Sequence, residues 1–240
     1  MPDLGEQAIS KIAEVGIASQ LDEVENLDVA IQTDPLKVIS GAVDSVTIAG
    51  QGLVMQQDLR VEKMQLNTGS IAINPLSAAL GKIELTRPTD ADLQVILTEA
   101  DLNRAFNSEF IQGKMQNLSI SVDGQPQTVN TQQVELRLPG EGKLAIAAEL
   151  HLHETGTLQK VAFTAVPTLS PNGECIQLEQ VEYTENSVPE VAEALLAQAQ
   201  ALLDLRNFSL EGMSLRLKAL DVQAGRMKFR AEAAITQFPS

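Results

Sequence analysis

Two histidines and a glutamate lie two residues apart in a segment that reads as a strand. Glu149, His151 and His153 would project from one face, because side chains two apart in a strand point the same way. A structural zinc site needs four ligands, and the sequence places no fourth one nearby. Alternating apolar residues from Leu144 to Leu152 assign the opposite face to the core. We therefore interpret the three polar residues as a solvated face and predict neither a metal site nor a cofactor.

Nucleophile and phosphate-loop patterns are equally incomplete. The run from Gly140 to Lys143 reads GEGK, but it lacks the full G-x-x-x-x-G-K-[ST] length, and a strand pattern follows it instead of a helix. With Pro139 it predicts a hairpin turn. Cys175, the single cysteine, has no histidine placed near it by the sequence and reads as a small buried side chain. The patterns G-x-S-x-G, H-E-x-x-H and G-x-G-x-x-G do not occur. We predict that the protein is not an enzyme.

Basic residues gather near the C-terminus. Residues 206–235 contain six basic and three acidic side chains, a net +3 in a chain whose formal net charge is -15. Arg226, Lys228 and Arg230 would share one strand face, and Arg216 and Lys218 another. Each cation near an anionic membrane surface contributes about 1 kcal/mol of attraction. We therefore predict a peripheral docking face at Arg226, Lys228 and Arg230. The alternative is that these charges protect an exposed sheet edge from pairing.

Composition restricts the partners and the core. The net charge of -15 repels phosphate backbones, and the chain has no Trp, one Tyr and six Phe, so few rings could stack on bases. We predict no nucleic-acid partner and a core of aliphatic side chains. The 240 residues contain no low-complexity tract or Pro/Ser-rich linker, which favours one domain over residues 1–240.

The first residues, MPDLGEQAISKIAEVGIASQL, have no basic leader and no uninterrupted apolar run. No window approaches the roughly 18 apolar residues that a membrane-spanning helix needs. These patterns predict a soluble protein of the cytoplasm or a comparable lumen, with peripheral membrane contact at most.

Apolar residues at helical spacing predict helices over 4–20, 99–110 and 189–204. The first rests on Ile9, Ile12, Ala13, Gly16 and Ile17. Thr98 with Asp101 three residues later resembles an N-cap of the second. Pro189 suits the first turn of the third. Its apolar face contains Val188, Val191, Ala192, Leu195, Leu196, Ala199, Leu202 and Leu203.

Between these helices the apolar period is two. Short alternating runs centre on residues 27–31, 46–48, 71–73, 83–85, 93–97, 134–138, 144–152, 161–165, 176–178, 215–217 and 227–235, and Gly, Pro, Asn or Asp bound most of them. There is no βαβ rhythm, which argues against a doubly wound parallel sheet. We predict an α+β protein with one continuous, strongly curved antiparallel sheet and the three helices.

Two stretches resemble a known family. The run from Val95 to Arg104, VILTEADLNR, resembles the strand-then-helix signature LTEADLN of the LmeA-like phospholipid-binding family. The run from Gly41 to Ile48 resembles that family's early strand, and Leu217 to Ala233 its closing hairpin. The resemblance implies a fold related to the tubular lipid-binding proteins, in which a curved antiparallel sheet wraps a long helix beside an apolar groove. Without an export signal, the sequence looks more like the cyanobacterial or plastid-type branch than the actinobacterial members.

The aliphatic composition, the long strands and the broad apolar face of helix 189–204 agree with a lipid groove. We therefore expect non-catalytic binding, or transfer, of a phospholipid or another acyl-chain ligand between the sheet and this helix. The candidate wall residues are Leu195, Leu196, Leu202, Leu203, Leu150, Leu152 and Phe163. A protein-interaction scaffold that uses the same apolar surface is the alternative, and an unrecognised hydrolase is a more distant one.

Overall fold

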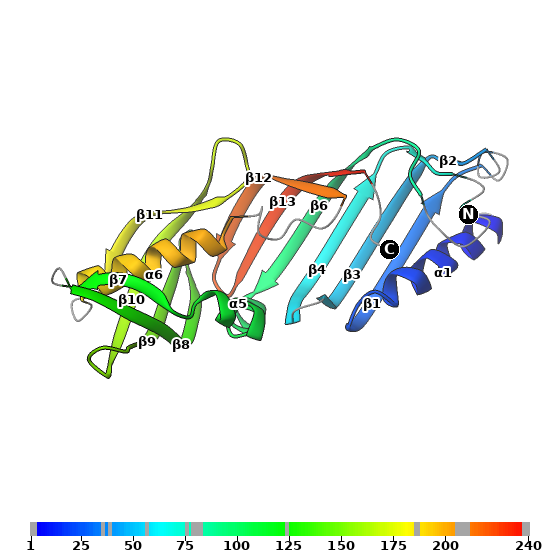
Figure 1. Cartoon of the computed structure of the whole chain (residues 1–240). Helices are drawn as coiled ribbons and strands as arrows, with labels where there is room; N and C mark the ends of the chain where they lie inside the picture. Colours follow the sequence, from blue (N-terminus) through cyan, green and yellow to red (C-terminus); the bar gives the residue numbers. More distant parts are fainter. Residues whose placement is uncertain are drawn as a thin grey trace.

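The computed structural model describes residues 4–34, 37, 40–55, 58–74, 77, 84–122, 125–184, 188–204 and 212–236, and these form a sheet-dominated α+β fold (Figure 1). The helices are α1 (Leu4–Ala18), α4 (Glu99–Phe106), α5 (Glu109–Lys114) and α6 (Pro189–Leu202). The strands are β1 (Glu23–Gln32), β2 (Ala42–Val43), β3 (Ser45–Met55), β4 (Leu59–Thr68), β5 (Ile71–Ala72), β6 (Thr89–Thr98), β7 (Leu118–Val122), β8 (Gln125–Gly140), β9 (Lys143–Leu152), β10 (Thr157–Leu169), β11 (Ile176–Tyr183), β12 (Met213–Gln223) and β13 (Arg226–Ile235).

The strands form two large sheets. One has the order β1-β3-β4-β6-β13-β12, the other β11-β10-β9-β8-β7, and β2 pairs with β5. Every pairing between these strands is antiparallel, as the sequence predicted. The expectation of one continuous sheet is wrong. Figure 1 shows the two sheets side by side along an elongated molecule, with α1 at one end and α6 at the other.

The helix expected over residues 99–110 is two helices. Asn107 ends α4, and Ser108 begins α5 by accepting a hydrogen bond at its Oγ from the N–H of Ile111 over 3.4 Å. α6 has 14 residues and packs on β7, β10 and β11 of the five-stranded sheet. Within the described residues, no long helix is wrapped by a sheet.

The predicted hairpin at Gly140 is confirmed. Gly140 pairs with Lys143, and the two residues between them, Glu141 and Gly142, have φ angles of 56° and 74°. Positive φ at both central positions is the geometry of a tight turn whose twist matches the flanking strands.

α1 closes the open edge of the six-stranded sheet at β1. The Oγ of Ser10 accepts a hydrogen bond from the N–H of Ile31 over 3.0 Å, and Oε1 of Glu6 accepts one from the N–H of Thr33 over 3.1 Å. These side chains satisfy donors that would otherwise offer an edge to another strand. Ile12, which the sequence placed on the apolar face of this helix, is exposed.

Candidate functional site

The seven predicted wall residues come together between α6 and the five-stranded sheet. Leu150, Leu152, Phe163, Leu195 and Leu202 belong to one buried cluster, and Leu196 and Leu203 pack against it. Phe163 is 1% exposed and Leu195 is 2% exposed. Their side chains therefore fill this region as core, and the sequence did not show how tightly they pack.

A second apolar surface covers one face of the six-stranded sheet. Cross-strand neighbours form two rows that each run over all six strands. The first apolar row is Val29, Ile48, Leu66, Leu93, Ala231 and Leu217. The second apolar row is Leu27, Gly50, Met64, Val95, Phe229 and Leu220. On the opposite face, the intervening row is Asp28, Ala49, Gln65, Gln94, Arg230 and Ala219, which is mostly polar.

The middle of the two apolar rows is only partly covered. Ile48, Leu66 and Leu93 in the first row, and Met64 and Phe229 in the second, are half-buried, whereas Val95 between Met64 and Phe229 is buried. At the β1 end, Ala13 and Ile17 of α1 pack on the same surface. At the β12 end, Leu220 contacts both the cluster around Leu217 and the α6 cluster, so the apolar surface continues into the region of the predicted wall residues.

The length of the rows suits an acyl chain. Six strands about 4.8 Å apart span about 24 Å. One leaflet of a bilayer is about 15 Å of hydrocarbon, half of the whole core. The sequence did not indicate this surface, because its pattern predicted no strand at the position of β4, which supplies Met64 and Leu66.

The predicted docking cations lie on the other face of the sheet. Arg226 and Arg230 are exposed and Lys228 is half-buried, whereas Met227 between the first two cations and Ala231 after the last are buried. The guanidinium of Arg226 donates to Oε1 of Gln223 over 2.7 Å. Because β13 pairs with both β6 and β12, these charges do not protect a sheet edge.

The run that carries the family resemblance joins the two sheets. The carboxamide of Asn103 on α4 donates to the carbonyl of Leu136 over 2.7 Å and accepts from its N–H over 2.8 Å. Asn107 bonds the N–H and carbonyl of Val134 in the same way, over 3.3 and 2.8 Å. One helical turn before Asn103, Oε2 of Glu99 accepts a hydrogen bond from the N–H of Leu138 over 2.7 Å. This stretch of β8 thus meets α4 where a neighbouring strand would lie, which is why the sheet is interrupted.

Asp101 is the buried carboxylate of that run, with a side chain 1% exposed. One oxygen accepts from the N–H and hydroxyl of Thr98, over 2.7 and 2.6 Å, and the other from Arg60 over 2.5 Å. Hydrogen bonds to Asp101, Glu25 and Glu62 raise the pKa of Arg60 above its ordinary value. The capping box that Thr98 and Asp101 predicted is confirmed, and its bonds assign Asp101 a structural role.

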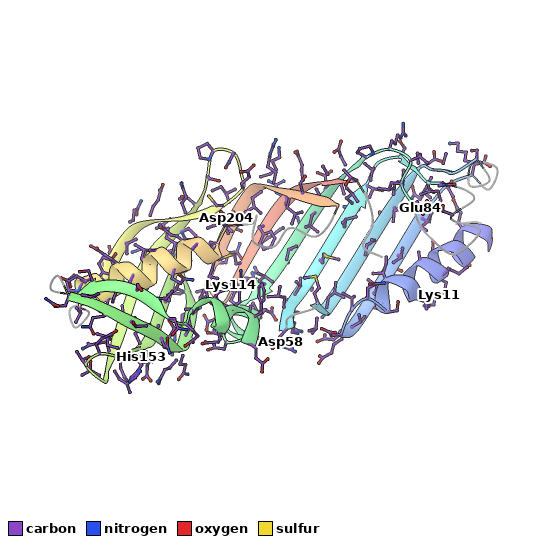
Figure 2. The ribbon with its side chains drawn as sticks, in the orientation of Figure 1. Lys11, Asp58, Glu84, Lys114, His153 and Asp204 are labelled. Atoms are coloured by element: carbon purple, nitrogen blue, oxygen red, sulfur yellow. The ribbon has the colours of Figure 1, made fainter. Side chains whose placement is uncertain are left out.

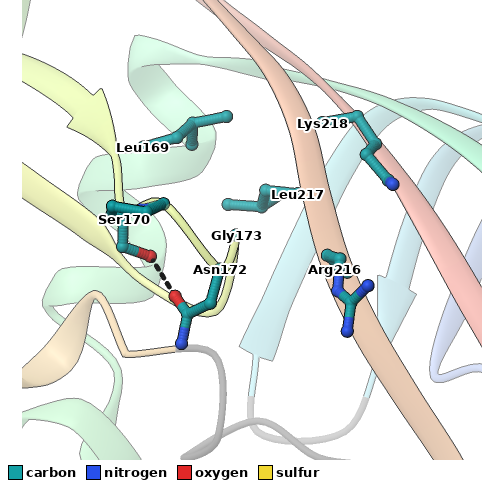
Figure 3. Close-up of a pocket in the computed structure, with 8 residues that line it drawn as sticks. Leu169, Ser170, Asn172, Gly173, Arg216, Leu217 and Lys218 are labelled. Atoms are coloured by element: carbon teal, nitrogen blue, oxygen red, sulfur yellow. Dashed lines mark hydrogen bonds between the residues drawn. The ribbon is translucent and has the colours of Figure 1, made fainter.

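Two polar hollows lie at the edge of the six-stranded sheet. One of about 520 Å³ separates the loop of residues 169–173 from residues 216–218 of β12 (Figure 3). Its loop is held by Ser170, whose hydroxyl donates to Oδ1 of Asn172 over 2.7 Å, and by the carbonyl of Gly173, which accepts from the N–H of Leu217 over 2.8 Å. A larger hollow of about 1090 Å³ lies beside it, around Thr68, Arg87, Leu215 and Arg216.

The remaining chemical candidates are His151 and His153 with Glu149, and Cys175. The rings of His151 and His153 are 5.0 Å apart at one end of the molecule, where Figure 2 labels His153, and Glu149 pairs with Lys160 over 3.0 Å. Cys175 is half-buried, and its backbone forms an isolated antiparallel β-bridge with the backbone of Asp204. Within the described residues, no three His, Cys, Asp or Glu side chains are grouped to hold a metal ion.

None of the described helices is both long enough and apolar enough to cross a bilayer. Residues 3–232 match the LmeA-like phospholipid-binding family. The search of curated proteins found no match.

Proposed function

Because the chain belongs to the LmeA-like phospholipid-binding family, we propose that it binds a phospholipid, or another ligand with an acyl chain, without catalysing a reaction. The observation that carries this proposal is the pair of apolar rows across the six-stranded sheet, in which most of the central side chains are half-buried. A sheet face that is apolar over six strands normally lies against other elements. An acyl chain is an occupant of suitable length and chemistry.

The acyl chain lies along the open part of the rows, over Ile48, Leu66 and Leu93. From there it extends towards the α6 cluster, which is continuous with the rows through Leu220. The predicted wall residues Leu195, Leu202 and Phe163 would form the closed end of this path. Because these side chains are packed, entry of a chain there requires α6 to shift away from β10 and β11.

A non-catalytic role agrees with the state of the buried carboxylate. Both oxygens of Asp101 are already hydrogen-bonded, to Thr98 and to Arg60. A general acid or base would need an oxygen free to reach the reacting atom. Docking on anionic membranes through Arg226, Lys228 and Arg230 is a separate part of the proposal, supported by the outward position of the two arginines.

Native mass spectrometry of protein purified from its own host tests the proposal. A co-purifying phospholipid, or uptake of phosphatidylcholine added to the delipidated protein, is the expected result. A protein mass without lipid, unchanged after addition, would instead favour a scaffold that uses the apolar rows to bind another protein. Conversion of the added lipid into a lysolipid and a fatty acid would reveal a hydrolase.

A further inference from the structure

Two large apolar side chains stand on the outer side of α1. Ile12 is 74% exposed and Val15 is 62% exposed, the two highest values among the large apolar side chains that the structure describes. They lie three residues apart on a helix and therefore form one ridge. Ala13 and Ile17, on the inner side of the same helix, pack on the six-stranded sheet, so the ridge is not needed for that contact.

The ridge carries no net charge of its own. Lys11, next to Ile12, forms an ion pair with Glu14. This neutral pair would give little electrostatic attraction to an anionic membrane, and the formal net charge of the chain, -15, would repel one. Contact of this helix with a bilayer would therefore depend on burial of apolar area in the interface.

The size and position of the ridge favour a bilayer over a second copy of the chain. A stable protein interface buries about 800 Å² on each partner, far more than two aliphatic side chains offer. α1 also covers the β1 end of the apolar rows, where Ile17 belongs to the same cluster as Ile48 and Met64. Figure 2 places Lys11, beside the ridge, at the end of the molecule opposite His153.

We propose that the Ile12–Val15 ridge inserts into the bilayer surface and brings the β1 end of the apolar rows to the membrane. The proposal rests on the proposed function in one respect, because the lipid that the rows bind would come from that bilayer. Insertion depends on apolar burial, so it does not require anionic lipid and does not weaken with salt.

Flotation with phosphatidylcholine vesicles tests this directly. The wild type is compared with the double variant Ile12→Ser, Val15→Ser, and Leu158→Ser is the matched control, since Leu158 is 57% exposed on β10 in the other sheet. We expect the double variant to partition at least about tenfold more weakly, because burial of each aliphatic side chain is worth about 1.5–3 kcal/mol. The control should bind like the wild type, and raising the salt from about 0.05 to 0.5 M should leave wild-type binding unchanged.

Equal partitioning of the wild type and the double variant would overturn the inference, as would the absence of any wild-type binding to these vesicles. Loading with a monomeric short-chain phosphatidylcholine, followed by native mass spectrometry, keeps this outcome separate from the proposed function. Short-chain lipid bound equally by both proteins leaves the function standing even if the ridge is irrelevant. Vesicle binding that needs the ridge, without any lipid uptake, would support the inference while contradicting the function.

Discussion

The carboxamide of Asn103 pairs with the backbone of Leu136 on both sides, donating over 2.7 Å and accepting over 2.8 Å. With Glu99 and Asn107 it forms a ladder at helix positions i, i+4 and i+8 that meets Leu138 and Val134 on β8. The spacing of four residues along the helix matches the spacing of two residues along the strand, since four helical residues rise about 6.0 Å and two strand residues about 6.8 Å. α4 thus satisfies the edge of β8 and fastens the five-stranded sheet beside the six-stranded one.

Replacement of Asn103 by alanine should destabilise the whole chain. It leaves the N–H and carbonyl of Leu136 without their partners in a partly buried place, at a cost of about 1–3 kcal/mol in the free energy of unfolding. Urea denaturation measures this cost. The control is Asn26→Ala, at an exposed position of β1, which should change the value by less than about 0.5 kcal/mol. Equal stability of both variants would show that the ladder does not hold the sheets together.

The sequence predicted this region in part. The strand-to-helix switch at Thr98 and the acidic residue three positions later indicated the N-cap, and the resemblance to LTEADLN singled out the run. The pairing of Asn103 with Leu136 could not be predicted, because its partner lies 33 residues away. The same limit explains the error of one continuous sheet, since only the fold shows that α4 occupies the place of a strand along β8.

The open apolar surface was missed for a local reason. In β4, the apolar residues Leu59 and Val61 stand at odd positions, whereas Met64 and Leu66 stand at even positions. The run therefore does not show the strict alternation of apolar and polar residues that predicts a strand. β4 nevertheless forms because β3 and β6 pair with it on both sides. By contrast, the seven predicted wall residues follow regular periods of two and 3.6 along their elements, and they pack in one cluster around α6.

Substitution of Gly173 should weaken a second contact between the sheets, the one between the loop of residues 169–173 and Leu217 of β12. A Cβ at this position would lie 2.3 Å from the carbonyl oxygen of Leu217, and the φ angle is +71°. Gly156 has a similar φ of +64° with open space around it, so Gly156→Ala isolates the cost of the backbone conformation. We expect Gly173→Ala to lower the free energy of unfolding by about 1–3 kcal/mol more than Gly156→Ala. Equal losses would mean that the loop can move away from β12 at no cost.

Glu154 should make stability depend on acid pH. Its carboxylate accepts hydrogen bonds from the N–H and hydroxyl of Thr128, over 2.7 and 2.9 Å, and the bond from the N–H is the main reason that its pKa lies below 4.5. Because the pKa is depressed, the contribution of Glu154 to the free energy of unfolding is complete above pH 4.5. It disappears as the pH falls through the folded-state pKa.

Urea unfolding of the wild type and Glu154→Gln between about pH 3 and 7 measures this contribution. The wild type should be the more stable protein at neutral pH, and the difference should shrink at low pH. Glu190→Gln, at an exposed position of α6, controls for the loss of a surface charge. A difference between wild type and Glu154→Gln that grows on acidification would contradict the assigned sign.

The three cations of β13 should act only on anionic membranes. In the variant Arg226→Glu, Lys228→Glu, Arg230→Glu, co-sedimentation with anionic vesicles at low salt should fall, because each cation is worth about 1 kcal/mol near such a surface. Binding of the wild type to the same vesicles should weaken as salt shortens the Debye length to about 8 Å and below. Neutral vesicles should bind both proteins alike. If anionic vesicles also bind both alike, the cations have no docking role.

The position of the bound acyl chain is the most direct test of the proposed site. A phospholipid with a nitroxide on its acyl chain broadens the methyl NMR signals that lie near it. Ile48, Leu66 and Leu93 lie on the apolar face, whereas Ile96 lies on the opposite face of the same strand as Leu93, paired with Lys63 and Lys228. We predict that the signals of Ile48, Leu66 and Leu93 broaden and that those of Ile96 remain sharp. Broadening confined to Ile96, or no broadening at saturating lipid, would contradict binding on the apolar rows.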